Sequence, residues 1–118
     1  MSRKKPVARR SEAPPVESPP GVTRRTLAYN EESMLCHFHL EKGAIIPLHH
    51  HPAVQNGYVV RGRVRFLGED GRSFVAEGGC GYVFDPHEPH GAEALEETEV
   101  VDFFTPMRPE YLPDPGRP

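Results

Sequence analysis

Short runs of Val, Phe, Tyr and Leu alternate with turn-forming residues along most of this chain. Apolar side chains occupy every second position from Met34 to Leu40, as in a strand with one face exposed to solvent. Asp70 and Gly71 lie between the runs 64–67 and 73–76, a pattern typical of a β-hairpin. Further turns are expected at residues 41–43 and 77–81. Since no segment has a helical period, the sequence predicts an all-β barrel or sandwich.

The distribution of proline divides the chain into a folded core and two ends. Five of the 14 prolines lie within residues 6–20, and another five lie within residues 106–118. We therefore predict one domain over residues 22–112, preceded by a flexible, Pro-rich, basic arm at residues 1–21 and followed by a C-terminal tail at residues 113–118. A chain of 118 residues is long enough to bury a core without cross-links.

The formal net charge of −3 conceals an uneven distribution of charge. Residues 1–25 contain seven Lys or Arg and two Glu, which leaves the rest of the chain with a net charge of −8. A basic arm can contact phosphates, but this one has no aromatic residue on which bases could stack. Nucleic acid is therefore not an expected partner.

Two further features concern the compartment. No stretch approaches the ~18 apolar residues of a membrane span, and no apolar segment follows the basic N-terminus as it does in a signal peptide. We therefore expect no membrane association and a soluble, cytoplasmic protein. Cys36 and Cys80 lie far apart in different predicted strands, so they indicate neither a redox pair nor a thiolate metal site, and both are interpreted as small apolar fillers.

Histidines cluster in the segment His49-His50-His51-Pro-Ala-Val-Gln55. On a strand, residues two apart face the same side, so His49, His51 and Gln55 would point inward from one sheet while His50 points away. If His90, from a distant part of the sequence, lies beside them, the site would contain three imidazoles and an amide oxygen, which suit a divalent transition metal. The alternative is that the three consecutive histidines form an exposed polar loop.

The spacing of these residues resembles the first motif of the cupin family, which runs Gly, five residues, His-x-His, three or four residues, an acid, six residues, Gly. The positions that fit are Gly43, His49, His51, Gln55 and Gly62, with Gln55 in place of the acid. The second cupin motif fits at Gly79 and His90, whereas Asp85, His87 and Ala94 replace its proline, glycine and asparagine. Over residues 33–105 the resemblance implies a cupin jelly-roll barrel with the metal inside.

A second cluster of interest follows His90 in the sequence. Strand parity places Val100, Asp102 and Phe104 on one face, with Val101 and Phe103 on the other. Both faces are largely apolar, so we expect the strand to be covered on both sides and Asp102 to be buried or to line a cavity. A buried carboxylate needs a partner, which favours a functional or paired role. Arg108 is a candidate for that partner.

This block, an Asp and a Phe two residues apart followed by Pro, Arg and a Tyr-Leu pair, resembles the end of the pectin-degradation family of small single-domain cupins. That family opens 4,5-unsaturated uronate monosaccharides to the linear keto form, and its members also use Gln as the fourth ligand. The resemblance implies that the metal ligands are His49, His51, Gln55 and His90. It implies that Asp102 and Arg108 act on a small-molecule substrate. The chain departs from the family at Val54, where relatives often carry Glu, and residues 1–22 have no counterpart.

The sequence is compatible with more than one function. The favoured function is a non-redox, metal-dependent opening or isomerisation of a small unsaturated sugar acid, with Zn, Ni, Mn or Fe as the metal. The alternatives are a metal-dependent dioxygenase and a non-catalytic ligand-binding or sensing cupin. Arg108 could instead form a structural salt bridge with Asp102 or Glu110. We also expect a homodimer, formed through residues 22–29 and the Pro-rich arm, with His37 and His39 facing solvent or a neighbouring subunit and His87 at the surface.

Overall fold

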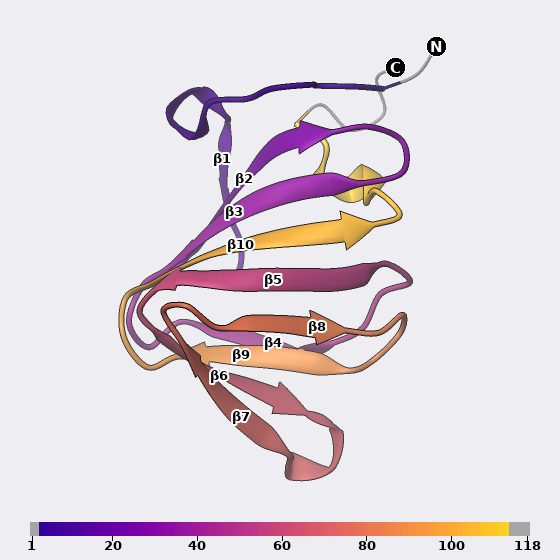
Figure 1. The fold of residues 1–118 in the computed structure, drawn as a ribbon. Helices are drawn as coiled ribbons and strands as arrows, with labels where there is room; N and C mark the ends of the chain where they lie inside the picture. Colours follow the sequence, from indigo (N-terminus) through magenta and orange to yellow (C-terminus); the bar gives the residue numbers. More distant parts are fainter. Residues whose placement is uncertain (1–2, 114–118) are drawn as a thin grey trace.

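Two antiparallel sheets make up the computed structural model of this chain, which describes residues 3–113 (Figure 1). The strands are β1 (Pro15–Glu17), β2 (Val22–Tyr29), β3 (Met34–Leu40), β4 (Ile45–His49), β5 (Val54–Arg61), β6 (Arg63–Gly68), β7 (Ser73–Glu77), β8 (Gly81–Phe84), β9 (His90–Ala94) and β10 (Thr98–Thr105). Three short 3-10 helices accompany them: η1 (Arg10–Glu12), η2 (Glu69–Gly71) and η3 (Pro109–Tyr111). The six-stranded sheet has the order β1-β2-β3-β10-β5-β8, and the four-stranded sheet has the order β4-β9-β6-β7.

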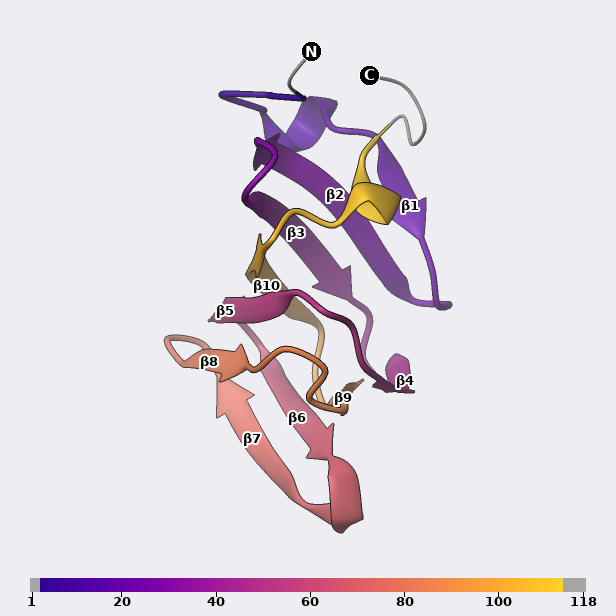
Figure 2. The same ribbon diagram turned by 90° about the vertical axis from the view of Figure 1, so that its right-hand side faces the viewer.

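The two sheets form the predicted jelly-roll barrel. In Figure 1, β2, β3, β10, β5 and β8 lie one below another, and the turned view in Figure 2 places the β6–β7 hairpin at the end of the molecule opposite β1 and β2. Alternate residues of both sheets fill the interior, as strand periodicity requires. Met34, Cys36, Phe38 and Leu40 are all buried, which confirms the predicted inward face of β3. The all-β fold class is therefore confirmed.

The predicted hairpin joins β6 to β7. Val64 pairs with Ala76 and Leu67 with Ser73, on either side of the turn at residues 69–71. Asp70 and Gly71 both have positive φ, at 65° and 72°. Glycine adopts this region without steric cost and Asp tolerates it better than most residues, so the turn chemistry read from the sequence is the chemistry that the hairpin uses.

The segment before β2 differs from the predicted flexible arm. Strand β1 pairs with β2, and the Lys5 backbone exchanges two hydrogen bonds with Tyr29, of 2.8 and 3.0 Å. The Arg25 guanidinium donates to the carbonyl oxygens of Arg10 and Ala13, at 3.0 and 2.9 Å. Main-chain hydrogen bonding, which composition does not report, thus holds this segment along the barrel. Of the predicted C-terminal tail, residues 114–118 lie outside the described residues, as do residues 1–2 of the arm.

Strand β10 positions one functional candidate and exposes one apolar side chain. Val100, Asp102 and Phe104 are buried, as the parity of this strand predicts. The expectation that both faces are covered is wrong, because Phe103 on the outer face is 41% exposed. Cys36 lies in β3, whereas Cys80 lies in the turn before β8 and not in a strand, and both are free. Within residues 3–113, no helix has the length and apolar character to cross a membrane.

Candidate metal centre

The four predicted metal ligands converge between the two sheets. His49 ends β4 and His90 begins β9 in one sheet, Gln55 lies in β5 of the other, and His51 lies in the loop between them. One ring nitrogen from each of the three histidines lies within 4.8 Å of the others. His51, Gln55 and His90 are buried.

The prediction that His49, His51 and Gln55 share one strand is wrong. Strand β4 stops at His49, and the chain crosses to the opposite sheet before β5 begins at Val54. Pro52 interrupts the segment because it has no N–H for a strand ladder and restricts the residue before it. The ligands therefore come from both walls of the barrel, and the site bridges the two sheets.

Backbone carbonyl groups determine which nitrogen of each imidazole carries a proton. The three Nδ1 atoms lie 2.9 Å from the Pro47 oxygen (His49), 2.9 Å from the Ala53 oxygen (His51) and 2.8 Å from the Glu88 oxygen (His90). A carbonyl oxygen only accepts, so each Nδ1 must donate. In a neutral ring, the Nε2 atom then presents a lone pair. Burial lowers the pKa of His90 to about 4 and also lowers the pKa of His51, so both rings are neutral near pH 7.

Gln55 completes a set of lone pairs that face one another. Its Nε2 donates to Asp102 Oδ2 at 3.0 Å, which turns its Oε1 toward the histidines. That oxygen lies 3.1 Å from Nε2 of His51 and 3.1 Å from Nε2 of His90. With Nδ1 protonated, both contacts join an acceptor to an acceptor, an arrangement that a cation between them would stabilise. Imidazole nitrogens with carbonyl contacts behind them, together with an amide oxygen, suit a divalent transition metal.

Gly91 lets the two histidine-bearing strands approach each other. His49 and His90 are paired across β4 and β9, and their ring centroids are 4.4 Å apart. A Cβ atom at Gly91 would lie only 2.7 Å from the Ile46 carbonyl oxygen, so any side chain there would push β4 away from β9. The glycine directly after His90 therefore sets the spacing of these two ligands.

Asp102 lies behind Gln55, deep in the barrel. Both of its oxygens accept hydrogen bonds: Oδ2 from Gln55 and Oδ1 from the Tyr82 hydroxyl at 2.5 Å. Burial raises the pKa of Asp102 to about 7, while the hydrogen bonds from Tyr82 and Gln55 act in the opposite direction. The site thus pairs a cation-binding group with a carboxyl whose pKa is near neutrality.

Two residues of the site were missed in the sequence. Tyr82 points inward from β8 to Asp102, and Gly57 in β5 lies opposite both of them. A Cβ at Gly57 would lie 2.2 Å from Asp102 Oδ1 and 2.4 Å from the Tyr82 hydroxyl, so only glycine leaves room for their contact. The available signal was the alternation around Tyr82 and Phe84, but the partner of Tyr82 depends on the register of three strands.

Arg108 pairs with Glu110 and not with Asp102. Its Nε and Nη2 donate to Glu110 Oε2 at 3.2 and 3.0 Å, which matches one of the two structural pairings considered from the sequence. Its guanidinium lies 4.0 Å from the centroid of the Tyr111 ring, within the range of a cation–π contact. Arg108 nevertheless borders a cavity of about 60 Å³ that is also lined by His49, Gln55, His90 and Asp102. All six predicted site residues therefore lie in one region, with His51 Nε2 at its edge, 3.1 Å from Gln55 Oε1.

The other histidines of this region lie outside the cluster. His50 is exposed, and its ring centroid is 5.9 Å from that of His87. His87 is exposed as well and has a φ of 62°. Both positions agree with their predicted place at the surface.

Comparison with known proteins agrees with the cupin fold. The family model described as the cupin domain matches residues 36–104. The chain is 32% identical over 103 residues to the pectin degradation protein KdgF of Dickeya dadantii, an alignment that covers 86% of this chain and 93% of that protein. It is 33% identical over 97 residues to the L-ectoine synthase of Teredinibacter turnerae, covering 77% and 73%. The solved structure of KdgF from Halomonas sp. has a TM-score of 0.82 and 30% identity, covering 90% of this chain and 97% of that one.

Proposed function

Because this chain belongs to the cupin domain family, we propose that it is a metal-dependent enzyme that opens the ring of a 4,5-unsaturated uronate without oxidation or reduction. The observation that carries this proposal is the hydrogen bond from Gln55 to Asp102. It places a buried carboxyl group next to the neutral side chain that would bind the metal. The similarities to KdgF and to L-ectoine synthase are of nearly equal size, so the choice of reaction rests on the residues of the site.

The metal would be Zn, Ni, Mn or Fe, held by His49, His51, His90 and Gln55. When bound, it would supply Lewis acidity to a substrate oxygen. Three neutral imidazoles and a neutral amide leave the positive charge of the ion less compensated than a carboxylate ligand would. This ligand set favours polarisation of a substrate over redox chemistry with oxygen, for which a carboxylate is the commoner companion of two histidines.

Asp102 would carry the proton. Ring opening is an isomerisation in which the anomeric hydroxyl loses a proton and its carbon becomes an aldehyde, while the bond from that carbon to the ring oxygen breaks. The enol that results becomes a ketone when a carbon of the double bond gains a proton. A carboxyl group with a pKa of about 7 can accept and return a proton near neutral pH. Tyr82 and Gln55 each donate to one of its oxygens, so the carboxyl plane is held in one orientation.

Arg108 would bind the substrate carboxylate. Its guanidinium is 12% exposed and faces Glu110 Oε2 with two N–H groups, an arrangement that a uronate carboxylate could take over. The cavity of about 60 Å³ is smaller than the pockets that enclose whole ligands, which are several hundred Å³. The reacting end of the sugar would therefore enter the cavity after Arg108 has exchanged Glu110 for the substrate.

The test combines metal analysis with a turnover assay. The protein is loaded with each of the four metals and incubated with 4,5-unsaturated galacturonate or guluronate, and loss of the enol absorbance is followed. Asp102→Asn keeps an acceptor for Gln55, so we expect unchanged metal content and turnover lowered by about 10²–10⁴-fold. Absence of acceleration by the metal-loaded wild-type protein would exclude the proposed reaction. Oxygen uptake by the iron-loaded protein would instead favour the dioxygenase, and binding without turnover would favour the sensing cupin.

A further inference from the structure

The segment that follows β10 returns along the barrel wall and contributes one side of the cavity. It comprises residues 106–112, here called the strap, and Figure 2 shows it in yellow beside β2. Met107 and Leu112 anchor its two ends, since both side chains are buried. Between them, the Thr26 hydroxyl in β2 donates to the Tyr111 carbonyl oxygen. The strap therefore holds the Tyr111 side chain, which lines the cavity, in a fixed place.

Two guanidinium groups meet the ring of Tyr111. The Cζ atom of Arg24 lies 3.9 Å from the ring centroid, and that of Arg108 lies 4.0 Å from it. Phe38 and Phe104 contact the same ring edge-to-face, with centroid distances of 6.4 and 5.6 Å. Edge-to-face neighbours and a cation over the ring face are both favourable, so the ring is fixed from several sides. The two guanidinium groups thus share one aromatic support.

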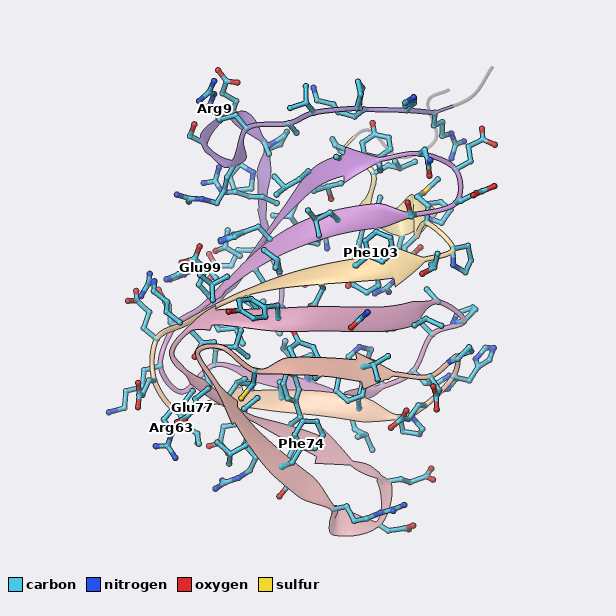
Figure 3. The ribbon with its side chains drawn as sticks, in the orientation of Figure 1. Arg9, Arg63, Phe74, Glu77, Glu99 and Phe103 are labelled. Carbon is cyan, nitrogen blue, oxygen red and sulfur yellow. The ribbon has the colours of Figure 1, made fainter. Side chains whose placement is uncertain are left out.

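Arg24 is a cation on the inward side of β2 without an acidic partner. It alternates with Val22 and Thr26, which are both buried, and it is half-buried itself. Within residues 3–113, no carboxylate forms a salt bridge with Arg24. By contrast, Arg63 on the outside of the barrel lies 3.9 Å from Glu77 (Figure 3). The aromatic ring of the strap is therefore the group that stabilises the Arg24 guanidinium.

The charges around the strap favour an anion. Both Cζ atoms lie within 4.0 Å of one point, so the two guanidinium groups are no more than about 8 Å apart. Glu110 pairs with Arg108, which leaves the charge of Arg24 uncompensated by a direct contact. Partial burial weakens the screening of these charges by water. A ligand that brings a carboxylate to the strap would be attracted by both guanidinium groups.

Binding of a carboxylate by Arg108 needs a support that remains when Glu110 leaves. If a substrate carboxylate replaces Glu110, the guanidinium loses hydrogen bonds of 3.2 and 3.0 Å. A long side chain released in this way would have to be ordered again by the ligand, at a cost in rotamer entropy. The contacts that remain are the rings of Tyr111 and Phe104, whose centroids lie 4.0 and 5.1 Å away. Cation–π attraction weakens with distance, so Tyr111 is the principal support.

We propose that Tyr111 is a positioning residue whose ring holds the Arg108 guanidinium at the cavity for the carboxylate of a sugar acid, and that Arg24 steadies the same ring from β2. The identity of the sugar acid rests on the proposed function, whereas the role of the ring requires only a small carboxylate ligand. Tyr111 accepts a hydrogen bond through its backbone oxygen, but its hydroxyl has no partner within the described residues. The ring, and not the hydroxyl, is therefore the part that positions Arg108.

Kinetics of metal-loaded variants test the role of Tyr111. Tyr111→Leu removes the aromatic face and should raise the KM for the unsaturated uronate about tenfold with kcat nearly unchanged, because the lost support acts equally before and during the reaction. Tyr111→Phe keeps the aromatic face and should stay within about twofold of the wild-type protein. Tyr58→Leu is the matched control, since Tyr58 is 48% exposed and does not line the cavity. Circular dichroism checks that each variant remains folded.

Two further sets of variants separate positioning from a purely structural role. In an Arg108→Gln background, Tyr111→Leu should cause no further loss of kcat/KM, because the ring acts through the guanidinium. Arg24→Gln should raise KM about threefold, and Arg24→Lys should raise it less because the positive charge is kept. Arg63→Gln is the control for the loss of one positive charge, since Arg63 lies on the outside of the barrel.

Calorimetric titration with galacturonate and galactose distinguishes this proposal from the proposed reaction. Galacturonate has the carboxylate but no double bond, so we expect it to bind more tightly than galactose without reacting, and Tyr111→Leu to remove most of this preference. That result without turnover of the unsaturated uronate would exclude the ring opening and support the positioning role. Turnover with an unchanged KM and unchanged galacturonate affinity in Tyr111→Leu would overturn the positioning role alone. A wild-type protein without preference for galacturonate, an equal loss in Tyr111→Phe, or additive losses in the Arg108→Gln background would also overturn it.

Discussion

Asp102 links the chemistry of the site to the stability of the fold. In the folded chain, burial raises the pKa of its carboxyl group to about 7, compared with about 3.9 in an unfolded chain. Between these two pH values the native state retains a proton that the unfolded state has released. The free energy of unfolding contributed by Asp102 is therefore highest below about pH 4 and falls as the pH rises to about 7. His90 acts in the opposite direction, because its pKa is lowered to about 4.

Replacing Asp102 with Asn removes the first contribution and leaves that of His90 unchanged. We therefore expect the variant to gain stability relative to the wild-type protein as the pH rises from about 5 to about 8, by a few kcal/mol. Urea unfolding of both proteins in the presence of a chelator, at several pH values, measures this difference. Parallel stability profiles for the two proteins would show that the carboxyl group titrates normally.

Glu110 controls the availability of Arg108. Its carboxylate accepts two hydrogen bonds from the guanidinium that would bind the substrate. We expect Glu110→Gln to lower KM several-fold with little change in kcat, because a competing anion is removed and the proton carrier is untouched. Stability should change by less than about 1 kcal/mol, since Glu110 is largely exposed. Glu12→Gln, at a distant exposed ion pair, is the control. A raised KM would mean that Glu110 positions the guanidinium.

At the scale of strands, the site depends on the register of β8, β5 and β10. Gly57 faces Asp102 on one neighbour and Tyr82 on the other. We expect Gly57→Ala to cost about 1–3 kcal/mol of stability and to reduce turnover, because the new methyl group would overlap both side chains. Gly81→Ala is the matched control, since a Cβ there meets only the Gly57 oxygen at 3.6 Å. Chemical unfolding and the uronate assay measure the two effects. Equal losses in both variants would contradict this assignment.

The same register explains what the sequence could and could not predict. The inward faces of β3 and β10 and the turn at Asp70 depend on local alternation and turn chemistry, so the sequence predicted them correctly. Tyr82 and Gly57 are meaningful only as partners of Asp102, and nothing within either segment indicates which strands are neighbours. The structure brings His49, His51 and Gln55 together, but from two sheets and a loop and not from the single strand that the sequence predicted. The spacing of these residues in the sequence is the same whether they lie on one strand or on either side of a crossing between sheets. The crossing near Pro52 could therefore not be recognised from that spacing.

At the scale of the whole molecule, the candidate metal centre lies between the two sheets. His49 and His90 belong to the four-stranded sheet and Gln55 to the six-stranded sheet, while His51 lies in the connecting loop. A cation bound by all four residues would therefore oppose separation of the sheets, and its binding free energy would add to the stability of the fold. At a free metal concentration 100 times the dissociation constant, this gain is about 2.7 kcal/mol.

Metal removal should therefore lower the melting temperature of the whole domain. For the wild-type protein, we expect a chelator to lower Tm by several degrees and re-addition of metal to restore it. His49→Ala should lose this metal-dependent part and show nearly the same Tm with and without chelator. His50→Ala is the matched control. The His50 side chain follows His49 in the sequence but is exposed and lies outside the cluster, so this variant should respond to the chelator as the wild-type protein does. Differential scanning calorimetry with metal analysis of each sample measures both quantities. An equal response of the two variants to the chelator would contradict a metal held between the sheets by His49.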